Sequence, residues 1–211
     1  MKLMSTSFAD NQRMPSDYAF CTQDSRTHTN FGPNRNPQLG WGDLPMGTKS
    51  LALICHDPDV PSVPDDVNKE GREIAANLPR IDFFHWILVD LDPLSGPIEA
   101  GEFSDGGVTP RGKPGPQGPR GTRHGLNDYT SWFANTEEMK GDYFGYDGPC
   151  PPWNDTIPHR YVFTLYALDI EQLPVSGIFR AAEALNAMRG HVLGEATLTG
   201  AYSLNPRVPA T

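Results

Sequence analysis

Four segments of the chain carry the apolar or alternating pattern of β-strands. They are residues 50–56 (SLALICH), 83–93 (FFHWILVDLDP), 161–168 (YVFTLYAL) and 195–206 (EATLTGAYSLNP). The alternation is nearly strict in 161–168, which is typical of a strand with one buried face. We expect the first strand to turn within DPDVP and the second to end at Asp-Pro. The pattern therefore predicts a β-rich core.

Helical spacing is clear in one segment, residues 178–194. The apolar positions that recur there are Ile178, Ala182, Leu185, Met188 and Val192. Gly194 is expected to break this helix before the last strand. A weaker helical pattern covers residues 67–78, where Gly71 lowers the helix propensity. We therefore predict few helices, with one of them near the C-terminus.

A long polar segment, residues 101–145, separates the second strand from the third. It is rich in glycine and shows little periodicity, and loops of this length often cover functional sites. The chain length of 211 residues favours a single domain, 1–211. Its 21 glycines and 21 prolines favour short strands joined by turns.

The charge balance narrows the classes of partner. Lysine and arginine total 17 against 26 acidic residues, which gives a formal net charge of −9. Nucleic acids and anionic bilayers are polyanions, so neither is an expected partner. The strongest apolar stretches, LALIC and FFHWILV, are too short to span a bilayer, and no apolar run follows the N-terminal lysine as in a secretory signal. We expect a soluble cytoplasmic protein without stable membrane insertion.

The cysteines are Cys21, Cys55 and Cys150, an odd number without paired spacing. This usage predicts free thiols in a reducing compartment.

Three stretches combine reactive side chains with rigid backbone at strand ends. They are HDPDVP at 56–61, FFHW at 83–86, and GPCPP at 148–152, which is followed by His159, Arg160 and Tyr161. Proline fixes its own backbone angle and restricts the preceding residue, so GPCPP is expected to hold one shape as a pocket rim. Each stretch also has a structural interpretation, because strand histidines are often core groups and Asp-Pro often begins a turn.

Taken in order, DPDVP, FFHW, GYDGPCPP and HRYVFTLYALD resemble the phosphatidylethanolamine-binding protein family, also called Raf-kinase-inhibitor-like, and most closely its bacterial and archaeal branch. The resemblance covers nearly the whole chain. It implies a mainly β fold, a β-sandwich in which a large antiparallel sheet packs on a smaller one, with peripheral helices. Relative to compact members of the family, residues 62–82 and 101–145 look like insertions.

The resemblance also implies a small cavity for anions such as phosphate, phosphoethanolamine or acetate. The matching pocket residues are Asp57, His85, His159 and Tyr161, with Gly148, Cys150 and Pro151 in the rim. It further implies a cis bond at Val60–Pro61.

The residue chemistry fits such a site. His85, His159 and Tyr161 can donate hydrogen bonds to an anion, and backbone N–H groups around Gly148 can add more. Asp57 would charge and orient a histidine, or receive the ammonium end of a zwitterion. Asp59 and Arg160 are expected to form a structural ion pair instead.

The leading hypothesis is a protein that binds a small anion or a phospholipid headgroup, without a cofactor. The resemblance adds regulation through inhibition of a kinase or protease, hence a protein target, and a homodimer. An alternative is an enzyme that uses Asp57, His85 and His159 for acid–base chemistry. A third hypothesis, a metal site of His56, Asp57, His85 and His159, is the weakest because no two ligands have a local chelating spacing.

Overall fold

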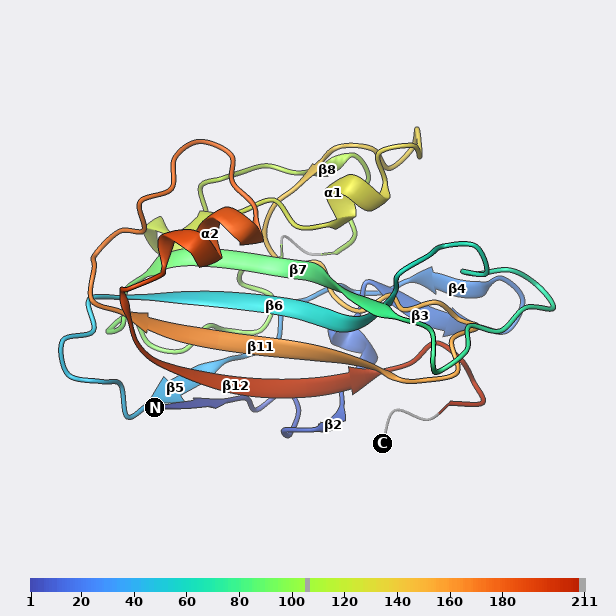
Figure 1. The fold of residues 1–211 in the computed structure, drawn as a ribbon, viewed down its shortest axis with the longest axis horizontal. Helices are drawn as coiled ribbons and strands as arrows, with labels where there is room; N and C mark the ends of the chain where they lie inside the picture. The colour runs from blue at the N-terminus through green and yellow to red at the C-terminus, as the bar shows by residue number, and fades with distance from the viewer. Residues whose placement is uncertain (105–106, 209–211) are drawn as a thin grey trace.

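A large twisted sheet forms the centre of the molecule (Figure 1). The computed structural model describes residues 1–104 and 107–208. The sheet has six strands in the order β2-β12-β11-β6-β7-β9, antiparallel except for the β2–β12 pair. Its strands are β2 (Gln12–Arg13), β6 (Ser50–Pro61), β7 (Arg80–Leu91), β9 (Arg123–His124), β11 (His159–Leu168) and β12 (Val192–Tyr202). The four predicted strands thus form its four long members.

Smaller elements surround this sheet. Three two-stranded sheets pair β1 with β5, β3 with β4, and β8 with β10. Their strands are β1 (Lys2–Met4), β3 (Cys21–Asp24), β4 (His28–Phe31), β5 (Gly40–Gly42), β8 (Gly112–Lys113) and β10 (Asp142–Tyr143). The helices are α1 (Tyr129–Trp132) and α2 (Ala181–Ala187), with 3₁₀ turns η1 (Ser16–Tyr18) and η2 (Pro119–Gly121). No helix in the described part of the chain is long and apolar enough to cross a bilayer.

The alternation along the strands builds two apolar layers. On one face, Leu53, Trp86 and Phe163 pack against the N-terminal segments and the 101–146 region. On the other face, Ile54 and Ile87 pack beneath α2, which lies across the sheet near β7 (Figure 1). Side chains of a strand point alternately to opposite faces, so both faces of β6 and β7 are buried. The predicted fold class, mainly β with a sandwich arrangement and few helices, is confirmed.

The DPDVP segment differs from its prediction. It does not form a turn after the strand but continues β6 to Pro61, with irregular pairing to β7 around Cys55/His56 and between Asp57 and Val60. The predicted cis bond at Val60–Pro61 is also wrong, because the cis bond of the described chain is Gly115–Pro116. Irregular pairing re-aims side chains, which lets a β-strand carry this proline-containing segment.

The C-terminal helix is shorter than predicted. It covers Ala181–Ala187, and Val192 already belongs to β12. The buried helix face contains Ala181 and Ala184, whereas Ile178 is exposed. Gly190 has a φ of +83°, which ends the helical path four residues before Gly194.

The predicted helix at 67–78 is wrong, since this segment forms turns. Asn68 and Gly71 have φ values of +56° and +68°, which an α-helix does not accommodate. The carbonyls of Asp66, Lys69 and Arg72 accept bonds from the side-chain amide of Asn154 instead of from helical N–H groups. A tertiary contact therefore overrides the local pattern.

Candidate functional site

One cavity gathers most of the residues singled out in the sequence. It has a volume of about 360 Å³ and is lined by Asp57, His85, Cys150, Pro151, His159 and Tyr161 together with mainly apolar side chains. Gly148 does not line it. The predicted set therefore converges on one place, apart from that glycine.

Strand register explains this convergence. Strand β6 lies between β7 and β11, with Asp57 opposite Phe83 and His56 opposite Val162. Asp57, His85 and Tyr161 thus come from three adjacent strands, and all three side chains are buried. Three neighbouring strands place the polar groups on a rigid floor.

His159 is held between two carboxylates. Its Nδ1 atom lies 2.7 Å from Oδ2 of Asp57, and its Nε2 atom lies 3.0 Å from Oδ2 of Asp155. Both ring nitrogens therefore donate, and the ring is an imidazolium. Burial alone would lower the pKa of His159, but the two carboxylates outweigh it and raise the pKa to about 9. His159 has no free N–H for a ligand, so its predicted role as an anion donor is wrong.

Arg80 completes the charge balance around His159. Its guanidinium binds both oxygens of Asp155, at 2.5 and 3.1 Å. Two carboxylates, Asp57 and Asp155, thus meet two cations, His159 and Arg80. The polar floor carries no excess positive charge.

His85 is neutral and has a defined tautomer. Its Nδ1 atom lies 2.7 Å from the backbone carbonyl oxygen of Asp147, so Nδ1 carries the proton and donates it. Burial lowers the pKa of His85 to about 4, and this outweighs the nearby charge of Asp57. Its Nε2 atom has no hydrogen-bond partner in the described chain, and the residue lines the cavity. His85 thus presents an acceptor, and the prediction of an N–H donor is wrong.

A buried polar network lies behind His85, and sequence reasoning missed it. The Asp147 carboxylate accepts bonds from Asn34 at 2.8 Å and Asn127 at 2.7 Å, and pairs with Lys113 at 3.0 Å. Burial nevertheless raises the pKa of Asp147. The three partners lie in three separate stretches of the chain, so the only local signal was an aspartate next to the predicted rim.

Tyr161 contributes an unsatisfied hydroxyl. The side chain is 1% exposed, and its Oη atom has no hydrogen-bond partner in the described chain. Burial and the charge of Asp57 raise the pKa of Tyr161 well above its usual value, and Asp57 is near enough to the hydroxyl to add to this rise as an acceptor, although the two make no hydrogen bond of normal geometry. The phenol therefore keeps its proton. Buried polar groups are nearly always paired, and an unpaired donor in a cavity wall therefore points to a ligand or a water molecule.

The rim is closed by a disulfide bond between Cys21 and Cys150. The prediction of three free thiols is wrong, and only Cys55 is a free, buried cysteine among those described. Sequence spacing gave no sign of the pair, because the two residues are 129 positions apart. Disulfides persist mainly in oxidising compartments, so the cysteines no longer support a cytoplasmic location.

Gly148 supports the rim through backbone hydrogen bonds without lining the cavity. Its N–H donates to Oδ1 of Asn34, and its carbonyl accepts from the Tyr129 hydroxyl. A Cβ atom here would lie 2.0 Å from the Tyr18 carbonyl oxygen, which only glycine permits. Because the Gly148 N–H already donates to Asn34, it is not free to bind an anion, and the predicted anion-binding role of this N–H group is wrong.

Asp59 and Arg160 form a two-point pair outside the cavity. Nε and Nη2 of Arg160 lie 2.9 and 2.8 Å from the two carboxylate oxygens, and the Arg160 backbone N–H also donates to Asp59. This pair fastens β6 to β11 beside Asp57.

The mouth of the cavity is apolar and partly exposed. Phe31, Ile81 and Trp132 line it and are 60%, 52% and 49% exposed. They come from β4, β7 and α1. Large apolar side chains from separate elements around one opening mark a ligand or partner site, and the sequence pattern gave no signal for them.

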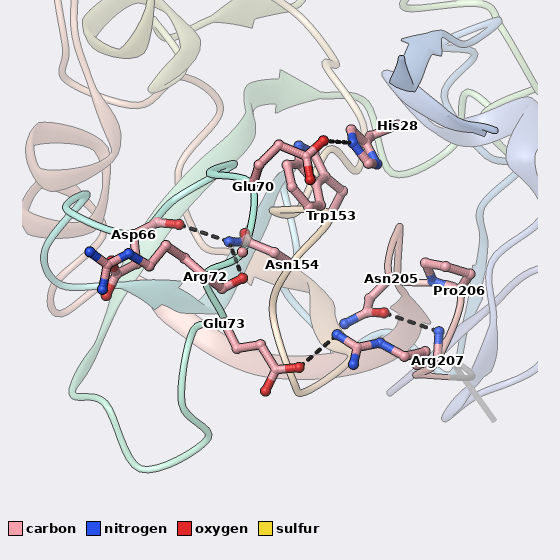
Figure 2. A pocket seen from close by; sticks show the side chains of 11 residues that line it. His28, Asp66, Glu70, Arg72, Glu73, Trp153, Asn154, Asn205, Pro206 and Arg207 are labelled. Carbon is pink, nitrogen blue, oxygen red and sulfur yellow. Dashed lines mark hydrogen bonds and ion pairs between the residues drawn. The ribbon is translucent and has the colours of Figure 1, made fainter. Parts of the chain in front are cut away.

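Figure 2 shows a second cavity, which has a volume of about 720 Å³. Its charged side chains pair with one another: His28 with Glu70 at 2.6 Å, and Arg207 with Glu73 at 2.7 Å. The His28 ring also stacks on Trp153, with ring centroids 3.9 Å apart. Each of these charged side chains thus has an ion-pair partner within the described chain.

The two cavities share one wall, the segment 66–73. Val67 and Asn68 face the first cavity, whereas Asp66 and Glu70 face the second. Asn154 anchors this wall through its side-chain amide, as described above, and accepts a bond from the Asn68 N–H at 3.0 Å. Within the described residues, no cluster of His, Cys, Asp and Glu is arranged to hold a metal ion.

Comparison with known proteins agrees with this architecture. The family model described as phosphatidylethanolamine-binding protein matches residues 4–203. A UPF0098 protein of Methanothermobacter thermautotrophicus is 34% identical, with 96% of this chain and 98% of that protein covered. UPF0098 protein YbhB of Escherichia coli is 31% identical, with 96% and 100% covered.

Two solved structures have the same fold. One is the crystal structure of a phosphatidylethanolamine-binding protein homologue, CT736 of Chlamydia trachomatis, with a TM-score of 0.62, 28% identity and 96% of each chain covered. The other is E. coli YbcL, described as a member of the mammalian PEBP family, with a TM-score of 0.67, 24% identity and coverage of 96% and 97%.

Proposed function

Because this chain belongs to the phosphatidylethanolamine-binding protein family, we propose that its cavity binds a small phosphorylated or carboxylated head that carries an apolar group, as in a phospholipid headgroup. The observation that carries the proposal is the buried, unpartnered hydroxyl of Tyr161. It is a donor that a ligand oxygen can satisfy. Its neighbours Asp57 and His85 supply further polar contacts.

The balanced charge of the floor limits the ligand. With Asp57 and Asp155 neutralised by His159 and Arg80, the cavity offers no net field for a highly charged anion. A head with one negative charge, or a zwitterion, fits this floor better than a polyphosphate does. Moving several ligand charges out of water without counterions would cost more free energy than the few hydrogen bonds available in the cavity could offset.

The apolar walls favour an attached hydrocarbon group. Phe20, Phe83 and Phe133 line the interior, and the exposed side chains at the mouth continue the apolar surface outward. A head bound at Tyr161 would direct its substituent toward this mouth. Regulation through a kinase or protease remains a prediction from the resemblance alone.

Isothermal titration calorimetry tests the proposal with phosphoethanolamine, phosphate, acetate and a short-chain phosphatidylethanolamine below its micelle concentration. We expect saturable binding, tightest for the ligand with an apolar group. Tyr161→Phe should weaken it by roughly tenfold, the value of one hydrogen bond to a charged group. Tyr166→Phe is the matched control, because Tyr166 lies on the opposite face of the same strand. Absence of binding by all four compounds would contradict the proposal.

A further inference from the structure

The hydrogen-bonding groups at the cavity floor are mostly acceptors. Both N–H groups of His159 already donate hydrogen bonds to carboxylates, and Asp57 is a hydrogen-bond acceptor of charge −1. His85 directs an unprotonated Nε2 to the cavity, since its other nitrogen donates to Asp147. Tyr161 supplies a buried donor without a hydrogen-bond partner, and the other such donor of the described chain, Nε of Arg80, belongs to a side chain that does not line the cavity. A ligand that can only accept hydrogen bonds would therefore place its lone pairs against the lone pairs of His85 and Asp57.

We infer that the cavity selects heads that carry a proton of their own, and that the preferred form is the singly protonated, monoanionic phosphate monoester. In this arrangement the P–OH group donates to Nε2 of His85, and an unprotonated phosphate oxygen accepts from the Tyr161 hydroxyl. This inference rests on the proposed function and specifies the protonation state of the ligand. Sites built to bond a hydroxyl discriminate strongly against analogues that lack it.

Asp147 is a positioning residue, because it holds His85 in the orientation and tautomer on which this selectivity depends. Its carbonyl binds Nδ1–H of His85, and its own N–H donates to the His85 carbonyl oxygen at 3.1 Å. Lys113 and Asn127 in turn hold the Asp147 carboxylate. One bond holds the His85 ring and the other holds the His85 backbone, which together fix the orientation of the ring. A second proton on the ring would charge a buried imidazole, which burial opposes.

Several charged or titratable groups surround His85. Asp57 and His56 come from β6, His159 and Tyr161 from β11, Tyr129 from α1, and Asp147 from the segment before the rim. Asp57 and His159 form a neutral pair, and both tyrosines keep their protons because burial raises their pKa values well above the usual range. Neither the neutral Asp57–His159 pair nor the two protonated tyrosines charge His85, so in the proposed arrangement the proton that bonds Nε2 comes with the ligand.

The ligand's own titration then sets the pH range of binding. A phosphate monoester loses its second proton with a pKa of about 6, after which it is an acceptor-only dianion. We therefore expect the apparent affinity to fall by about tenfold per pH unit above that value. Below a pH of about 4 His85 itself becomes protonated, and the acceptor is lost.

The decisive comparison uses methyl phosphate and methyl sulfate at pH 5. Both are then chiefly monoanions of similar shape, but only methyl phosphate carries a proton to donate. Calorimetry should show methyl phosphate binding at least roughly tenfold more tightly, the value of a hydrogen bond to a buried group. His85→Phe should remove this preference, whereas His56→Phe, whose side chain does not line the cavity, should keep it.

Each outcome of the experiment decides the matter. A preference of the wild-type protein for methyl phosphate over methyl sulfate that is clearly below about tenfold would overturn the inference and leave the proposed function standing. So would phosphate-ester affinity that stays constant between pH 5 and 8. If neither ester binds and the four compounds of the first titration also fail, the proposed function falls, and the inference falls with it. If neither ester binds but one of those four compounds does, the inference alone falls. The wild-type comparison remains decisive even if His85→Phe does not fold.

Discussion

Asp57 and His159 form a buried ion pair that joins two neighbouring strands, with Oδ2 of Asp57 2.7 Å from Nδ1 of His159. Asp155 binds the other nitrogen of the same ring. The imidazolium is therefore part of the fold, and its loss should affect stability as well as the cavity floor.

Stability should fall at alkaline pH. The folded pKa of His159 is about 9, above the usual 6.5, so its contribution is complete below pH 6.5 and is lost as the pH rises through 9. The expected loss is on the order of 3 kcal/mol in the free energy of unfolding, measured by urea titration between pH 6.5 and 9.5. His159→Gln should lack this decline, whereas His191→Gln, which changes a partly exposed pair, should retain it. A flat wild-type profile would contradict the prediction.

Tyr161→Phe should not lower the stability of the ligand-free protein. Its hydroxyl is buried without a partner, so removing it relieves a desolvation penalty of about 1 kcal/mol. Tyr146→Phe is the matched comparison, because that buried hydroxyl donates to the Tyr18 carbonyl at 2.6 Å, and its loss should cost about 1 kcal/mol. Equal losses for both variants in thermal denaturation would show that the Tyr161 hydroxyl has a partner after all.

Lys113→Met should strongly destabilise the protein. It leaves the buried Asp147 carboxylate without its cation, which typically costs about 3–5 kcal/mol. The double variant Lys113→Met/Asp147→Asn should recover part of this loss, because no uncompensated charge remains. Lys140→Met, in an exposed pair, should change the unfolding free energy by less than about 0.5 kcal/mol. A small effect of Lys113→Met would mean that the network matters little to the fold.

Reduction of the Cys21–Cys150 bond should destabilise the protein and loosen the cavity rim. The bond joins two residues 129 positions apart, and loops of about that size contribute roughly 4–5 kcal/mol in the chain-entropy treatment. Unfolding with and without a dithiol reductant measures the difference. Cys21→Ala/Cys150→Ala should abolish the response to the reductant, and Cys55→Ala should preserve it. A reductant effect in the double alanine variant would assign the loss to another cause.

Asn154→Ala should release the wall that the two cavities share. The variant removes an amide that binds the carbonyls of Asp66, Lys69 and Arg72. Hydrogen–deuterium exchange should accelerate by about tenfold or more in residues 66–73, because an opening free energy lower by 1.4 kcal/mol has that effect. Asn30→Ala, which changes an exposed bond to Asp24, should leave exchange there unchanged. Acceleration spread over the whole chain would indicate global destabilisation.

The strands and most of the cavity residues were predictable because they depend on local patterns. Alternation along residues 161–168 determined both the strand and which side Tyr161 faces. Proline-rich segments beside strand ends pointed to the rim at Cys150 and Pro151. Family resemblance then placed these segments in one site.

The hydrogen-bonding roles of the histidines were not predictable. Asp57 was expected to charge and orient a histidine, but which histidine it takes, His159 at a distance of 102 positions, depends on partners brought close by the fold. The helix expected at 67–78 failed for the same reason, since Asn154 captures carbonyls that a helix would use. Long-range contacts of this kind leave no periodic signal in the sequence.

The disulfide also divides the chain topologically. In the oxidised protein, residues 21–150 form a covalent ring, and residues 151–211 are its C-terminal tail, as residues 1–20 are its N-terminal one. Asp57 and His85 belong to the ring, whereas His159 and Tyr161 belong to the tail, whose strand β11 docks directly onto β6. In an unfolded oxidised chain, the covalent ring therefore contains two of these four floor residues, Asp57 and His85. His159 and Tyr161 join the floor only when strand β11 of the tail pairs with β6. Ligand binding in the cavity therefore requires that β11 is in place.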